Sequence, residues 1–278
     1  MANRSRGLRL QLTLFYIALS VPALLLIEQV MLGVQFQRCL SELDDGRVQR
    51  VLVRESEALA QALDDAVATG AQGIVLAGGP KVFSAGLDVP YLLSLGDDQD
   101  ALLGAWTVFF KAARALVACP VPVVAALAGH SPAGGCVLAL CCDYRIMAEG
   151  PYRIGLNETQ VGLVAPEGIQ SLLARMVGAH RAERLLVAGE MVDSAEALRI
   201  GLVDELTGID EVATRARIWL EVILQLPRAP MLQTRRIARA AAIDCLRDER
   251  IELSRFVSGW MQPDTQAALR AMLARIGK

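Results

Sequence analysis

Short apolar runs alternate with longer amphipathic segments over the first part of the chain. Residues 73–77 are apolar and are followed by Gly78-Gly79-Pro80, which is typical of a buried strand that ends in a turn. Between such runs, apolar residues recur at helical spacing, as in 55–68. The pattern predicts strands over 48–53, 73–77, 121–127 and 141–147, and helices over 55–68, 97–117 and 132–140. Strands that alternate with helices indicate an α/β fold with a parallel sheet.

After Pro166 the apolar residues keep a helical spacing to the end of the chain. Asp193-Ser194 followed by Glu196 is typical of a helix N-terminus. The expected helices cover 168–176, 180–188, 194–200, 211–226, 230–246, 249–260 and 264–276. We therefore expect an atypical N-terminal segment over 1–46, a core over 47–200 and a helical region over 201–278 that serves oligomerisation.

Residues 10–27 carry no charge and follow three arginines, as in a signal peptide or membrane anchor. However, the run includes Gln11, Thr13, Ser20 and Pro22, whereas a spanning helix needs about 20 mostly apolar residues. A buried segment is the favoured interpretation. Membrane contact through 10–27 stays open as the alternative.

The composition narrows the possible partners and metals. A net charge of −2, with no basic run that contains aromatic residues, argues against nucleic-acid binding. Six cysteines without a CxxC pair and only two histidines, His130 and His180, make a zinc site unexpected. The cysteines are expected to be buried thiols in a reducing compartment, and the histidines to be structural or exposed.

Two segments of small residues carry the candidate chemistry. Residues 83–88 (FSAGLD) and 131–136 (SPAGGC) each follow an apolar run, and neither holds a recognisable nucleophile motif or a set of metal ligands. Two backbone N–H groups that converge on one oxygen would explain both, because an oxyanion hole stabilises negative charge on a carbonyl oxygen. The matching carboxylate is Glu158 in 155–160 (GLNETQ), whose uncharged neighbours favour a raised pKa.

These segments, with 142–146 (CDYRI) and 178–184, resemble the crotonase (enoyl-CoA hydratase/isomerase) superfamily from about residue 58 onward. Within it they are most similar to the mitochondrial-type 3,2-trans-enoyl-CoA isomerase branch. The resemblance implies a crotonase-like spiral of ββα units, an acyl-CoA thioester substrate, a homotrimer or hexamer, and neither metal nor cofactor beyond the CoA of the substrate. It places the N–H donors at Leu87 and Gly134, the catalytic carboxylate at Glu158, and the CoA-binding loop at Ala85, Leu87 and Asp88.

The residue after the cysteine of the GGC segment separates two activities. Family hydratases have a second Glu there, and this chain has Val137, which cannot orient a water molecule. The pattern therefore favours a 3,2-enoyl-CoA isomerase. We expect such an enzyme to act in fatty-acid β-oxidation, in the cytoplasm or, in a eukaryote, in the mitochondrial matrix. Glu167 leaves hydratase activity open if it reaches the pocket, although a first-turn carboxylate on a helix is the simpler interpretation. A non-catalytic binding protein of the same fold is a further alternative.

Other conspicuous residues have structural interpretations. Asp88 is expected to cap the next helix. Asp143 and Arg145 are expected to pair with each other. Three aromatic residues, Trp106, Phe109 and Phe110, are expected in the core.

Overall fold

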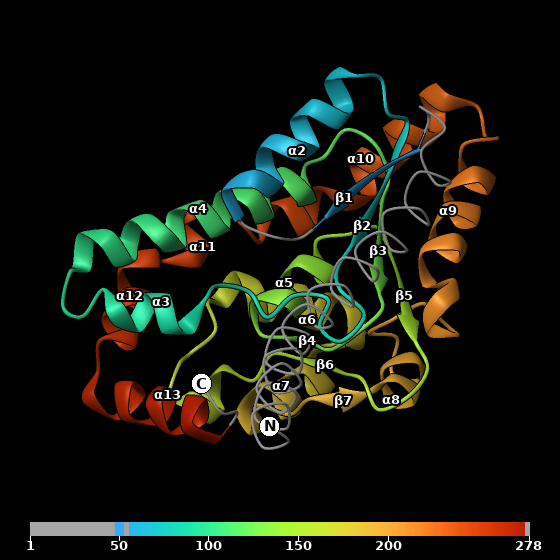
Figure 1. Cartoon of the computed structure of the whole chain (residues 1–278). Helices are drawn as coiled ribbons and strands as arrows, with labels where there is room; N and C mark the ends of the chain where they lie inside the picture. The colour runs from blue at the N-terminus through green and yellow to red at the C-terminus, as the bar shows by residue number, and fades with distance from the viewer. Residues whose placement is uncertain (1–47, 53–55, 276–278) are drawn as a thin grey trace, which may run out of the picture. The chain divides into compact units, whose positions relative to one another are not determined.

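A five-stranded parallel sheet organises the protein (Figure 1). The computed structural model describes residues 48–52 and 56–275, all of which belong to one unit that spans residues 45–278. The order of the strands across this sheet is β1-β2-β3-β5-β8. Their bounds are β1 (Val48–Leu52), β2 (Gly73–Ala77), β3 (Val123–Leu127), β5 (Tyr144–Ala148) and β8 (Glu205–Thr207).

Helices follow most of the strands and make up most of the C-terminal region. In chain order they are α2 (Ser56–Ala68), α3 (Val89–Ser94), α4 (Gln99–Val117), α5 (Gly134–Leu140), α6 (Glu167–Val177), α7 (Ala179–Ala188), α8 (Ser194–Arg199), α9 (Val212–Ile223), α10 (Arg228–Asp244), α11 (Asp248–Ile251), α12 (Leu253–Trp260) and α13 (Pro263–Arg275). Two 3-10 turns, η1 (Glu158–Val161) and η2 (Ile209–Glu211), complete the set among the described residues.

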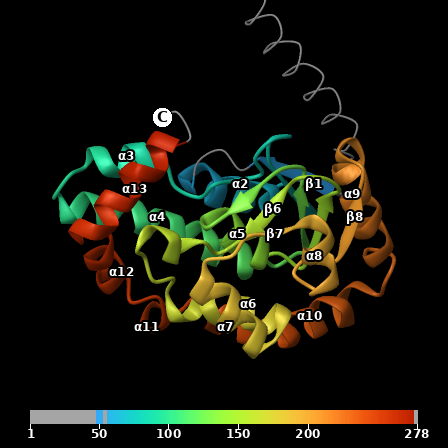
Figure 2. The same cartoon turned by 90° about the horizontal axis from the view of Figure 1, so that it is seen from below.

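Both faces of the main sheet are covered at its centre, so β2 and β3 are apolar on both sides. In β2, Ile74 and Leu76 face the large core with α2, α4 and α5, and Val75 and Ala77 face α9. Figure 2 shows α9 at one end of this unit and α3, α12 and α13 together at the other. The latter helices enclose a further apolar cluster around Trp260 and Phe256.

A second, smaller sheet carries the segments of chemical interest. It consists of β4 (Ser131–Pro132), β6 (Arg153–Gly155) and β7 (Val192–Asp193), with β4 parallel to β6 and β7 antiparallel to β6. An isolated parallel bridge joins Val82 to His130, immediately before β4. The chain segments around 82, 131 and 154 therefore run side by side in the same direction.

The expected elements are largely confirmed, and the differences lie mostly in the C-terminal part. β2 has the expected bounds, whereas β5 begins at Tyr144 rather than at residue 141. The expectation of helices alone after Pro166 is wrong, because β7 and β8 each pair with a strand of the preceding region. The helix expected over 249–260 is two helices, since Glu252 adopts a left-handed conformation (φ 45°, ψ 54°) that ends α11.

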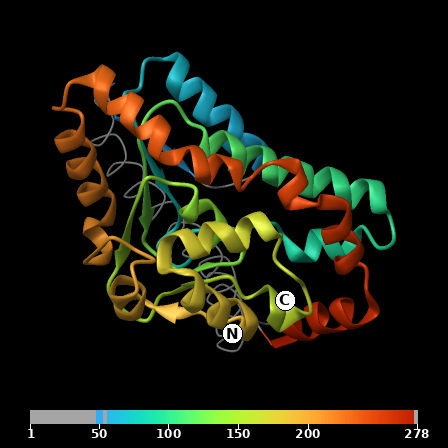
Figure 3. The same cartoon turned by 180° about the vertical axis from the view of Figure 1, so that it is seen from behind.

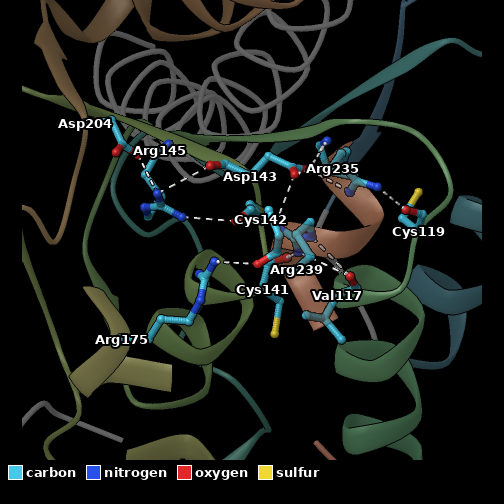
Figure 4. Close-up of polar contacts among 12 residues, drawn as sticks. Val117, Cys119, Cys141, Cys142, Asp143, Arg145, Arg175, Asp204, Arg235 and Arg239 are labelled. Atoms are coloured by element: carbon cyan, nitrogen blue, oxygen red, sulfur yellow. Dashed lines mark hydrogen bonds and ion pairs between the residues drawn. The ribbon is translucent and has the colours of Figure 1, made fainter. Parts of the chain in front are cut away.

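The expected pair between Asp143 and Arg145 is wrong, because each side chain finds a partner from a distant part of the chain (Figure 4). Arg145 pairs with Asp204 at 2.6 Å. Asp143 pairs with Arg235 at 2.7 Å and Arg239 at 3.1 Å, both on α10, which runs beside α4 (Figure 3).

Helix α10 also binds the C-terminal ends of α4 and α5. Arg239 is buried and donates hydrogen bonds to the carbonyl oxygens of Val117, at the end of α4, and of Cys141 and Cys142, just after α5. A guanidinium satisfies carbonyl groups that a helix C-terminus leaves without intrahelical donors. The cluster therefore fixes the far end of α5, the helix that begins at Gly134.

Several expectations concern residues that the structure does not describe. Cys39, the run 10–27 and all of the segment 1–46 with its boundary lie outside the described residues. Between residues 48 and 275, leaving out 53–55, no helix has the length and apolar character to cross a bilayer. The five described cysteines are free and buried, as expected.

Candidate active site

The three segments singled out in the sequence leave neighbouring strands at the same end. The Val82–His130 bridge and the β4–β6 pairing are both parallel. The chain continues from these strands to Leu87, to Gly134 and to Glu158. Because the carboxyl ends of parallel strands meet at one edge, the fold brings both proposed donor segments and the carboxylate segment to the same edge of the small sheet.

The two donor segments are in direct backbone contact at their glycines. A Cβ atom added to Gly86 would lie 2.8 Å from the Gly134 Cα, and one added to Gly134 would lie 2.6 Å from the Gly86 Cα. Gly86 also has a φ of +82°, which an L side chain rarely adopts. A Cβ on Gly135 would collide with the Ser84 carbonyl oxygen. Glycine is thus required where these two segments cross.

The residue before Gly134 has a strained backbone. Ala133 has φ 46° and ψ −118°, a region that non-glycine residues seldom occupy. Its N–H donates to the Gly155 carbonyl oxygen at 2.9 Å, and its carbonyl oxygen accepts the Val137 N–H at 3.0 Å. These bonds on both sides hold the strained conformation, which sets the direction in which the Gly134 N–H leaves the start of α5.

Glu158 is the first residue of η1, just after β6. Burial raises the pKa of its carboxyl to about 7 from an ordinary 4.5. A hydrogen bond from its own backbone N–H lowers this pKa, but by less than burial raises it. Its Oε2 atom is buried and has no hydrogen-bond partner among the described residues. Burial first, and then the Glu158 charge, raise the pKa of the Cys136 thiol in α5. The charge of Glu158 therefore influences the first turn of α5, in which Cys136 lies.

Positions 137 and 167 decide whether the site has a second carboxylate beside Glu158. Val137 is only 3% exposed and packs within the large core. The Glu167 side chain is 69% exposed and pairs with Arg250 at 2.6 Å. Arg250 also donates to the Ser171 hydroxyl at 2.8 Å, so Glu167 is held on the outer side of α6.

The remaining residues expected at the site lie on one loop and its continuation. Ala85 is exposed, and Leu87 is half-buried and packs against both the large core and the cluster around Trp260. Asp88 caps α3, as expected, by accepting the Tyr91 N–H at 3.4 Å. Phe109 and Phe110 are buried in the large core, also as expected, and the Phe109 ring would lie 3.1 Å from a Cβ on Gly134.

The described residues contain no group of three or more His, Cys, Asp or Glu side chains that could hold a metal ion.

The sequence did not reveal the place of His130, which is hydrogen-bonded to Lys81 and Phe83 on one side and to Arg153, at the start of β6, on the other. The one sequence feature that could have pointed to His130 is its position directly before the 131–136 segment. A histidine without an acidic neighbour in the sequence does not by itself indicate a role in the site.

Comparisons with known proteins identify the family of this chain. The profile of the enoyl-CoA hydratase/isomerase family matches residues 52–267. Enoyl-CoA delta isomerase 1, mitochondrial, from Mus musculus is 36% identical over 199 residues, which cover 71% of this chain and 68% of the relative. The Homo sapiens protein of that name is 34% identical over 208 residues, 74% of this chain and 68% of the relative. A probable enoyl-CoA hydratase from Mycobacterium avium (strain 104) is 36% identical over 156 residues, 56% of this chain and 59% of the relative.

Solved structures give the same class. The crystal structure of human mitochondrial delta3-delta2-enoyl-CoA isomerase superposes with a TM-score of 0.77 at 30% identity, covering 84% of this chain and 95% of that one. An enoyl-CoA hydratase from Bacillus halodurans has the same fold, with a TM-score of 0.72 at 22% identity over 81% of this chain and 96% of its own. The crotonase-like α/β fold is therefore confirmed. The chain belongs to the enoyl-CoA hydratase/isomerase family.

Proposed function

We propose that this protein is a 3,2-enoyl-CoA isomerase, which moves the double bond of a 3-enoyl-CoA to the 2-trans position. The observation that carries the proposal is one buried carboxylate, Glu158, whose pKa is raised to about 7. Glu158 follows β6, and β6 pairs with β4, the strand that leads into one of the two crossing backbone segments. The comparisons support the choice, because isomerases are among the relatives that match along most of the chain.

The reaction needs one base and one place for negative charge. The backbone N–H groups of Leu87 and Gly134 hold the thioester oxygen, while Glu158 removes a proton from C2 of the acyl chain. The electrons move into a dienolate whose charge rests on the thioester oxygen, where two N–H donors stabilise it. Glu158, now protonated, returns a proton to C4, and the double bond is left between C2 and C3.

A carboxyl with a pKa near 7 suits both halves of this cycle. At neutral pH it is sufficiently ionised to accept a proton and sufficiently acidic to return one. Its burial also keeps water away from the dienolate. The loop with Ala85, Leu87 and Asp88 would bind the CoA part of the substrate, and no metal or further cofactor takes part in these steps.

Hydration of a 2-enoyl-CoA is the competing activity. Hydration needs a water molecule that a second carboxylate holds in place. Neither of the two positions that could provide this carboxylate does so. Val137 is apolar and buried, and Glu167 is exposed and paired with Arg250. A non-catalytic role is disfavoured by the unpaired buried Oε2 atom of Glu158, because such an atom lowers stability and a catalytic role explains why the protein retains it.

We further propose that the protein acts in fatty-acid β-oxidation, in the cytoplasm or in a mitochondrial matrix, as a homotrimer or hexamer. Exposed apolar side chains on and after α9 and on α10 support assembly through residues 201–278. These are Val222 (63% exposed), Leu226 (50%) and Ile237 (66%).

The test is an ultraviolet assay with 3-enoyl-CoA and, separately, 2-enoyl-CoA of several chain lengths. We expect the absorbance of the conjugated thioester to rise with the first substrate and to stay nearly constant with the second. Rapid loss of absorbance with the second substrate would instead show a hydratase. Silence with both substrates would contradict catalysis on enoyl thioesters.

A further inference from the structure

His130 stands where the three site-bearing segments meet. Its backbone N–H donates to the Lys81 carbonyl oxygen at 3.0 Å, and its carbonyl oxygen accepts the Phe83 N–H at 2.8 Å. The adjacent Gly129 makes this approach possible, because a Cβ there would lie 2.5 Å from the Val82 nitrogen. The main chain of His130 thus ties the loop that leads to Leu87 to the strand that leads to Gly134.

The side chain makes the third connection. The His130 Nδ1 atom accepts the backbone N–H of Arg153 at 3.1 Å. Arg153 opens β6, and β4 begins one residue after His130, with Ser131 opposite Ile154. The imidazole therefore accepts the first backbone N–H of β6, the strand that leads to Glu158. This contact lies one residue before the pairing of β4 with β6 begins.

The ring is held for this contact. It packs edge-to-face against Tyr152, with centroids 5.6 Å apart and planes at 68°. Because Nδ1 accepts a hydrogen bond, the ring proton of the neutral imidazole is on Nε2. Tyr152 is half-buried between the two cores on either side of the main sheet, so the ring rests on a fixed support.

We propose that His130 is a positioning residue for Glu158: its Nδ1 fixes the start of β6 and thereby sets where the carboxylate lies relative to the two N–H donors. The inference rests on the proposed isomerase function for its kinetic consequence, but not for its structural one. A misplacement of about 1 Å in a catalytic group can lower a rate about a hundredfold. The backbone bonds to Lys81 and Phe83 do not depend on the side chain, so the donor loop stays in place when the imidazole is replaced.

Two substitutions separate the acceptor from the ring. His130→Phe keeps a ring against Tyr152 and removes the acceptor. His130→Asn removes the ring and keeps an acceptor oxygen near the place of Nδ1. We expect His130→Phe to lower kcat about tenfold or more with KM nearly unchanged, and His130→Asn to stay within about threefold of the wild type. The matched controls are His180→Phe and His180→Asn, at the exposed histidine of α7, which should leave kcat unchanged.

Amide hydrogen exchange tests the same inference without catalysis. The Arg153 amide should exchange faster in His130→Phe and stay protected in His130→Asn, while the Phe83 amide stays protected in both. The opposite order of the two variants, or wild-type kcat and Arg153 protection in His130→Phe, would overturn the proposal. If the wild type isomerises no 3-enoyl-CoA, the proposed function fails, and the exchange of the Arg153 amide still decides the role of His130.

Discussion

At the scale of single residues, the account depends on what burial does to one carboxyl group. Glu158 has a buried Oε2 atom with no partner in the described part of the chain, and a pKa raised to about 7. Desolvation dominates the shift, so the environment rather than a neighbouring charge prepares the group for proton transfer. Glu167, by contrast, lies in solvent beside Arg250 and shows how an ordinary carboxylate of this chain is placed.

The pH dependence of turnover follows from this shift. Glu158 must be ionised to take the C2 proton, so kcat/KM should be half-maximal near pH 7, level off well above it and fall about tenfold per pH unit well below it. The measurement is kcat/KM for 3-enoyl-CoA from pH 5 to pH 9, with circular dichroism at each pH to show that the protein stays folded. A profile that stays nearly flat down to pH 5, as an ordinary carboxyl value of 4.5 requires, would contradict a buried base.

At the scale of elements, the site depends on how closely two loops cross. The segment that contains Leu87 can lie against the start of α5 only because Gly86 and Gly134 carry no Cβ. Ala133, with its φ of 46°, then turns the chain into α5, whose other end is held by Arg239. The geometry of the donors is therefore a property of two segments and not of any one side chain.

Gly86→Ala tests this crossing. The added methyl group would meet the Gly134 Cα at 2.8 Å at a backbone angle unfavourable to alanine, so the donors must separate. We expect kcat to fall about a hundredfold, the usual effect of losing one oxyanion-hole donor. Gly104→Ala is the matched control, because Gly104 lies on the exposed side of α4 with nothing within 4 Å of its Cβ position. Equal activity of the two variants would argue against the crossing as the site of charge stabilisation.

Elements that local sequence defines could be predicted, and those that tertiary partners define could not. β2 is apolar at every position and ends at two glycines and a proline, so its bounds follow from the sequence alone. β8 has three half-buried residues and is a strand only because β5 offers it a free edge. In the same way, Glu158, Leu87 and Gly134 were marked by motif and resemblance, whereas the role of His130 depends on a contact with Arg153, 23 positions away in the sequence.

At the scale of the whole molecule, an ion cluster joins the C-terminal region to the core. Asp143 accepts from Arg235, Arg239 and the Val123 N–H, which links α10, the end of α5 and the start of β3. Asp143→Asn removes the charge but not the shape and leaves two poorly exposed arginines without a counter-ion. We expect a loss of about 3 to 5 kcal/mol in the free energy of unfolding.

Urea denaturation measures this loss. Glu196→Gln is the matched control, because Glu196 pairs with Arg199 in an exposed position, where solvent screens the charges and such a pair contributes little to stability. Similar effects of the two substitutions would mean that the Asp143 cluster contributes no more than a surface ion pair.

Assembly is the second prediction at this scale. If residues 201–278 form the interface of a trimer or hexamer, a charge at Val222 should dissociate it. Light scattering of Val222→Asp should then give the monomer mass, while Val187→Asp, on α7 and 77% exposed, should keep the mass of the assembly. A wild-type protein that is monomeric at micromolar concentration would contradict the proposed oligomer.

The central claim is that one carboxylate carries out both proton transfers, and Glu158→Gln tests it most directly. The substitution keeps the shape of the side chain and removes its ability to accept a proton. The measurement compares wild type and variant in turnover of 3-enoyl-CoA at pH 8, with affinity for a saturated acyl-CoA as the control for folding and binding. The account predicts that turnover falls by a factor of about a hundred or more while the affinity is unchanged. Turnover that stays at the wild-type level would contradict it.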